Sequence, residues 1–106
     1  LPDYKLWLLY GKPTQGRVVV DAGAVKALRG KGSLLPVGVV GVEGDFVPGD
    51  AVMVVDEQGI ELAKGLVTYS KKDLDRAKGL QSSRVAELLP QTSPEAIHRD
   101  YMVLVC

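Results

Sequence analysis

The feature that most constrains the fold of this 106-residue chain is a series of short apolar or β-branched runs separated by turn sequences. The runs RVVVD at residues 17–21 and AVMVV at residues 51–55 have the length and composition of β-strands. The intervening sequences VPGD at 47–50 and DEQG at 56–59 are typical of tight turns and hairpins. The chain therefore predicts many short strands, several of them joined as hairpins.

The same reading places six strands along the chain, including a buried first strand in the apolar run KLWLLY. We expect them at residues 5–10, 17–21, 39–42, 51–55, 60–69 and 101–105. A doubly wound parallel sheet needs regular alternation of strands and helices, which this order lacks. The pattern favours a mainly β domain, with the strands closed or nearly closed into a small barrel and short helices at its ends.

Capping residues predict where the helices lie. Asp21 is a good N-cap for a helix that Gly30 ends, and Ser70 opens a second helix that Gly79 closes. A third short helix is expected in residues 82–90, capped by one of two serines and stopped by a proline.

Composition excludes several classes of function. Thirteen basic residues balance 13 acidic ones, so non-specific binding to nucleic acid should be weak. No apolar run reaches the ~20 residues of a membrane span, which predicts no membrane partner. His98 and Cys106 alone provide too few ligands for a metal site. Because a single cysteine rules out an intramolecular disulfide, we expect a reducing, cytoplasmic compartment.

His98, Arg99 and Asp100 form a polar group ahead of the last expected strand. One interpretation is an anion-binding corner in which the Arg99 guanidinium grips a phosphate or carboxylate. The other is structural: a bond from Arg99 to a carboxylate, or from His98 to the backbone, fixes the entry to the strand. The structural interpretation is favoured, and both remain open.

The loop KGSLLPVG at residues 31–38 is the second candidate site. Gly32 and Gly38 let a ligand approach the backbone, and Lys31 could meet a phosphate. Alternatively, the two leucines of the loop close the end of the barrel. The aromatic residues are scattered along the chain, which favours roles in or beside the core over a stacking surface for nucleotides.

Several of these segments together resemble the PUA domain family. The loop GSLLPVGV at residues 32–39 is similar to the loop-to-strand signature of PUA domains. The sequences GDF at 44–46 and GDAV at 49–52 resemble the hairpin that follows it. The segment GLVTYS at 65–70 is similar to the approach to the next PUA helix. The resemblance implies a PUA-like pseudo-barrel with a mixed sheet, formed as a single domain over residues 1–106.

Three further segments are similar to one subset of the family, the glutamate 5-kinases: KLWL at 5–8, VDAGA at 20–24 and IHRDYMVL at 97–104. This resemblance implies a parent chain with an amino acid kinase domain, which binds ATP and Mg²⁺ and phosphorylates glutamate for proline biosynthesis. The kinase motifs are not in the sequence, so no catalytic residue or cofactor is carried over, and this chain alone should be inactive. A regulatory or assembly role in a homo-oligomeric parent is expected.

PUA relatives that bind RNA contact it through the first helix and the loop after it. The positions that match here are Lys26, Arg29, Lys31, Gly32 and Ser33. An RNA-binding module is therefore the alternative function that the resemblance implies.

Overall fold

The computed structural model describes residues 3–105. Its helices are α1 (Asp3–Tyr10), α2 (Ala22–Arg29), α3 (Lys71–Ala77) and α4 (Ser82–Leu88), with 3-10 turns η1 (Pro36–Gly38) and η2 (Arg99–Tyr101). Its strands are β1 (Thr14–Val20), β2 (Val39–Gly44), β3 (Ala51–Val55), β4 (Glu61–Leu66) and β5 (Met102–Leu104). Two residues discussed above, Cys106 and the side chain of Tyr4, lie outside the described part.

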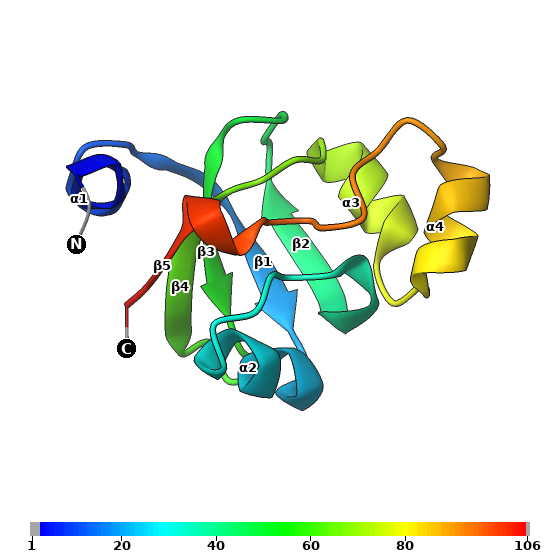
Figure 1. The fold of residues 1–106 in the computed structure, drawn as a ribbon, viewed down its shortest axis with the longest axis horizontal. Coiled ribbons are helices and arrows are strands. Elements are labelled where there is room, and N and C mark those ends of the chain that lie inside the picture. Colours follow the sequence, from blue (N-terminus) through cyan, green and yellow to red (C-terminus); the bar gives the residue numbers. More distant parts are fainter. Residues whose placement is uncertain (1–2, 106) are drawn as a thin grey trace.

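Within residues 3–105, the strands form one mixed sheet in the order β2-β1-β3-β4-β5 (Figure 1). β1 runs parallel to β3, and the other neighbouring strands pair antiparallel. The segments that lead into the two edge strands, β2 and β5, meet in a bridge between Leu34 and Ile97. The Leu34 N–H donates to the Ile97 carbonyl at 2.9 Å, and the Ala96 N–H donates to the Leu34 carbonyl at 2.7 Å. The bridge curls the sheet into the nearly closed pseudo-barrel that the sequence predicts.

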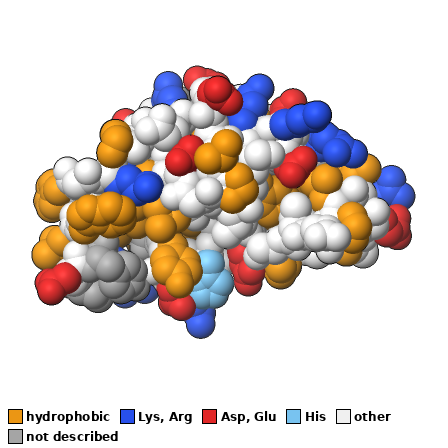
Figure 2. Space-filling view, turned by 90° about the horizontal axis from the view of Figure 1, so that it is seen from above, with side chains coloured by type: hydrophobic (Ala, Val, Ile, Leu, Met, Phe, Trp, Pro, Cys, Tyr) orange, Lys and Arg blue, Asp and Glu red, His pale blue; other side chains and the backbone are white. Residues whose placement is uncertain are grey.

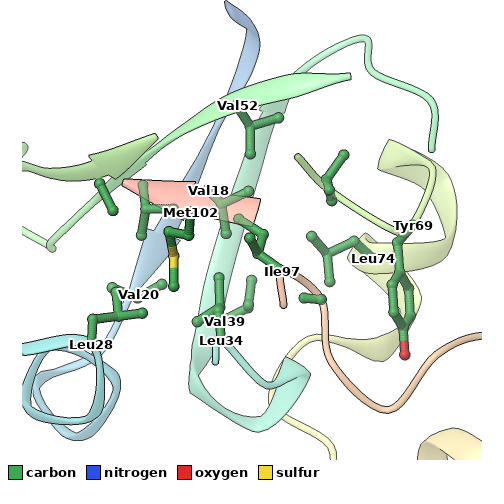
Figure 3. Close-up of a cluster of buried hydrophobic side chains, with 14 of the residues drawn as sticks. Val18, Val20, Leu28, Leu34, Val39, Val52, Tyr69, Leu74, Ile97 and Met102 are labelled. Carbon is green, nitrogen blue, oxygen red and sulfur yellow. The ribbon is translucent and has the colours of Figure 1, made fainter. Parts of the chain in front are cut away.

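One large hydrophobic core fills the barrel (Figure 3). Val18 and Val20 of β1 alternate inward, as expected for a strand with one buried face. By contrast, four of the five residues of β3 are buried, because this strand is central and covered on both faces. The bulkiest buried side chain is Tyr69, whose hydroxyl donates to the Ser93 carbonyl at 2.6 Å.

The sequence prediction of a first strand at residues 5–10 is wrong, since this run belongs to helix α1. The run contains three leucines and no β-branched residue, and leucine is a strong helix former. Both edges of the sheet are already engaged by the bridge between Leu34 and Ile97, which leaves no edge for another strand. Leu8 packs with Ala51 and Val103 on the outer face of the sheet, and the Gly11 N–H closes the helix on the Trp7 carbonyl at 2.7 Å.

The helices begin where capping chemistry predicts, with one exception. Asp21 Oδ1 accepts the Ala24 N–H at 2.8 Å, and Ser70 Oγ accepts the Asp73 N–H at 3.1 Å. The third helix, α4, begins at Ser82 after Gln81, which makes no side-chain cap. The predicted serine cap of this helix is therefore wrong. The helices lie around the barrel, with α1 at one end and α3 and α4 at the other (Figure 1).

The aromatic residues are divided between core and surface. Phe46 and Tyr69 are 1% exposed, as expected, but Trp7, Tyr10 and Tyr101 are more than half exposed. The expectation of core positions for these three is wrong, because α1 and η2 lie on the outside of the sheet. No helix in the described part of the chain is long and apolar enough to span a membrane.

Candidate ligand-binding site

Helix α2 carries the first group of predicted site residues. Lys26 and Arg29 lie in its last turn and are exposed. Cations near a helix C-terminus are favoured by the partial negative charge of the unpaired carbonyl groups. The two side chains thus give the end of α2 a positive surface at little conformational cost.

The turn after α2 has an unusual residue in a strained position. The Lys31 N–H donates to the Leu28 carbonyl and the Gly32 N–H to the Ala27 carbonyl, each at 2.9 Å. This pair of bonds is a Schellman motif, in which the residue corresponding to Lys31 adopts a left-handed conformation and is usually glycine. Lys31 has φ +64° and is the only described residue other than glycine with a positive φ. The chain therefore accepts backbone strain to place a lysine side chain here.

The second group of predicted residues lies in and before η2. His98 Nδ1 accepts the Asp100 N–H at 3.1 Å and lies 3.6 Å from Asp100 Oδ2. The ring of His98 also faces that of Tyr101, with centroids 6.2 Å apart. His98 makes the kind of backbone bond that the structural interpretation requires, while Arg99 makes no ion pair with a described residue.

A direct hydrogen bond joins the two groups. Ser33 Oγ accepts the Arg99 N–H at 2.9 Å, across 66 residues of sequence. The contact lies next to the bridge between Leu34 and Ile97, which holds the two segments in register. The structure thus brings together two sites that the sequence could only propose separately.

A cavity of about 400 Å³ opens beside this contact. Its lining residues are Lys5, Leu28, Lys31, Gly32, Arg99, Asp100, Met102, Val103 and Leu104. The floor is apolar and contributed mainly by β5, and the charged groups come from α1, the α2 turn and η2. A smaller hollow of about 240 Å³ lies on the other side of the α2 turn and includes Ser33 and Gly38.

The structure divides the predicted site residues. Lys31, Gly32, Arg99 and Asp100 line the larger cavity, whereas Lys26, Arg29 and His98 do not. Sequence reasoning missed the apolar floor and Lys5. The missed residues lack a local signal, because their position follows from the docking of α1 and β5 on the sheet.

Potential metal ligands do not gather in this part of the protein. Among residues 3–105, no group of three or more histidine, cysteine, aspartate or glutamate side chains lies close enough to hold a metal ion. The charges that line the cavity are mostly cationic, which suits an anionic ligand. Figure 2 shows apolar side chains gathered at the α1 end of the molecule.

A small mixed-sheet pseudo-barrel with a loop-and-helix site at its rim defines a class of compact binding modules. The profile of the PUA domain matches residues 16–89, and the chain belongs to the PUA domain family. The matched region includes the α2 turn and most of the sheet.

The curated relatives bear out the narrower resemblance to glutamate 5-kinases. A glutamate 5-kinase of Chromohalobacter salexigens is 52% identical over 99% of this chain and 30% of its own length. Glutamate 5-kinases of Synechocystis sp. and Meiothermus ruber are 47% and 50% identical, each over 94% of this chain and 27% of their own length. The chain thus spans somewhat over a quarter of the relatives it matches.

Solved structures share the fold. A PUA domain from Aeropyrum pernix, crystallised as a tartrate complex, is 27% identical with a TM-score of 0.61 and covers 79% of this chain and 41% of its own. A hypothetical protein from Pyrococcus horikoshii is 35% identical with a TM-score of 0.54, covering 60% of this chain and 38% of its own. A chain of an archaeal box H/ACA sRNP complex is 19% identical with a TM-score of 0.56, covering 82% and 26%.

Proposed function

We propose that this chain is the non-catalytic PUA accessory domain of a glutamate 5-kinase and regulates or assembles its parent enzyme. The observation that carries the proposal is the extent of the match, which takes in 94–99% of this chain but only 27–30% of the three relatives. The parent would phosphorylate the γ-carboxylate of glutamate in the first step of proline biosynthesis. ATP, Mg²⁺ and glutamate would bind in an amino acid kinase domain outside the matched region.

An exposed apolar surface at α1 supports docking on that kinase domain. Leu6, Trp7 and Tyr10 are 40%, 55% and 81% exposed on this short helix. Exposed apolar clusters of this kind mark interaction surfaces. A domain docked there regulates the parent only if its contacts differ between two states of the kinase domain.

The test is glutamate-dependent ATP turnover by the parent, with and without residues 1–106, across a proline titration. We expect turnover to persist without the domain, with an altered response to proline or altered assembly, and no turnover by residues 1–106 alone. Identical behaviour of the two proteins would remove the regulatory role.

A pair of matched variants of the parent locates the docking surface. Tyr10→Ser should reproduce the altered proline response or assembly, because it removes the most exposed aromatic side chain of α1. Ile60→Ser is the control, since Ile60 is similarly apolar and 55% exposed but lies in the β3–β4 connection. Equal effects of both variants would argue against docking through α1.

A second candidate function is RNA binding, favoured by the cations at the end of α2. Lys26 and Arg29 extend the positive surface beyond Lys31, and the fold is shared with a chain of an RNA-modifying particle. Replacing these three residues with alanine should weaken RNA binding and reduce its dependence on salt by about 0.7 in log–log slope per lost phosphate contact. Unchanged affinity in the triple variant would exclude this function.

The proposed setting is the cytoplasm, within a homo-oligomeric parent. The single cysteine of the chain supports a reducing compartment. Fractionation of cells that produce the full-length parent, followed by sizing of the soluble enzyme, would test the compartment and the oligomer together.

A further inference from the structure

We infer that the cavity between the α2 turn and β5 binds a small organic dianion with two carboxylates on a short aliphatic chain. The inference uses the geometry of the cavity alone, so it does not depend on the proposed link to a kinase. The cavity has a volume of about 400 Å³, which lies in the range of small-molecule sites.

Charge selects an anion. Lys5, Lys31 and Arg99 reach the cavity from three elements that are distant in sequence, and among residues 3–105 none of them has an ion-pair partner. Asp100 is the one carboxylate in the lining. Gathering like charges around one hollow raises their mutual repulsion, and a bound dianion would relieve it.

The shape of the lining selects an organic ligand over an inorganic one. The guanidinium group of Arg99 can pair with a carboxylate through two parallel hydrogen bonds, and its backbone is already held by Ser33 at 2.9 Å. Beneath the cations lie Leu28, Met102 and Val103, each at most 6% exposed. These apolar side chains suit the methylene groups between two carboxylates and offer nothing to inorganic phosphate.

Backbone strain points to the same site. Lys31 is the residue that accepts φ +64°, although Gly30 and Gly32 on either side show that glycine is common in this turn. Strain of this kind persists where the side chain has a use. The side chain of Lys31 lines the cavity, so the strained residue supplies one of its charges.

The binding test is isothermal titration of the 106-residue chain with glutarate, a five-carbon dicarboxylate. We expect saturable binding by glutarate, and binding about tenfold or more weaker by glutaramide, which has the same skeleton without charge, and by inorganic phosphate. Absence of saturable glutarate binding overturns the inference. Equal binding of phosphate also overturns it, because the apolar floor would then play no part.

Variants locate the ligand. Lys31→Gly and Arg99→Gln should each weaken glutarate binding about tenfold or more, while Lys72→Gln, which removes an exposed cation from α3, should leave it unchanged. Thermal unfolding is the control for folding, and Lys31→Gly should unfold at the same or a higher temperature because it relieves the strained turn. Equal affinity in all four proteins contradicts the assignment.

Two further outcomes separate this inference from the proposed functions. Binding of a single-stranded RNA oligomer without binding of glutarate would overturn the inference and favour the second candidate function. Binding of glutarate, together with an unaltered proline response in the truncated parent, would uphold the inference and contradict only the regulatory role.

Discussion

The ends of α2 and α3 solve the same local problem with different residues. Both helices are followed closely by a residue in the left-handed region, Lys31 at φ +64° and Gly79 at φ +76°. At Gly79, a Cβ atom would meet nothing within 4 Å, so glycine is there for its backbone freedom alone. At the end of α2 the same freedom is given up, and a lysine side chain is directed to the rim of the cavity.

The difference teaches where the fold accepts strain. Glycine reaches a positive φ at no steric cost, whereas other residues lose about 1 kcal/mol or more. The α3 end uses the least costly residue because its task is to turn the chain, and the Gly79 N–H then donates to the Pro36 carbonyl at 2.8 Å. The α2 end keeps a costlier residue beside unpaired cations, as expected of a binding site.

The largest effect should come from the core beneath α3. Leu74→Ala removes a side chain that is 0% exposed, and the cavity it leaves should lower the free energy of unfolding by about 2–5 kcal/mol. Urea denaturation measures this loss, with Lys72→Ala on the exposed face of the same helix as the control. A loss below about 1 kcal/mol would mean that the α3 end depends on its turn more than on its packing.

The next effect concerns the helix beginnings, where the two regions should behave alike. Asp21→Ala and Ser70→Ala each remove a side-chain cap, at 2.8 and 3.1 Å, and each should cost about 1 kcal/mol of unfolding free energy. Asp21→Asn is the matched control, because asparagine keeps the cap. Clearly unequal losses in chemical denaturation would show that α2 and α3 already differ at their N-termini.

Substitutions at the helix ends should have opposite signs. Gly79→Ala should destabilise the protein by about 1 kcal/mol through its positive φ, while Lys31→Gly should stabilise it by up to about 1 kcal/mol. Thermal unfolding of the two variants beside the natural chain is the measurement. Destabilisation by Lys31→Gly would break the comparison, since the lysine would then contribute to the fold.

The smallest effect is electrostatic and belongs to α3. A hydrogen bond and the charge of Lys78 lower the pKa of Asp75 below its ordinary value, and both side chains are exposed. A lowered pKa in the folded state means that the contribution to stability is present above the unfolded pKa and is lost as the pH falls through the folded pKa. NMR titration of the Asp75 carboxyl should show its pKa rising in Lys78→Gln, and 1 M salt should reduce the difference by screening. An unchanged pKa in that variant would contradict the pairing.

Local chemistry explains most of what could be predicted. The valine runs of β1 and β3, the caps Asp21 and Ser70, and the positive φ of Gly59 all follow from the preferences of a few neighbouring residues. The mixed character of the barrel was also predictable, since a mainly β chain of this length has few other ways to bury its strands.

The failures arose where local preferences were balanced. The run at residues 5–10 is apolar throughout, and without an alternating pattern its composition fits a buried strand or a helix almost equally. The exposure of Trp7 and Tyr101 follows from elements that lie on the outer face of the sheet. Neither placement can be read from neighbouring residues, because both depend on which sheet edges are already occupied.

The candidate site shows the same division. The sequence determined that Lys31 and Arg99 were available as cations, and that Asp21 and Ser70 would begin helices, because these properties belong to single residues and short segments. Only the tertiary structure decided that Arg99 would meet Ser33 across 66 residues, that Lys5 would join them, and that β5 would supply an apolar floor. Such contacts form when the edges of the sheet come together, and the free energy that selects them is distributed over the whole core.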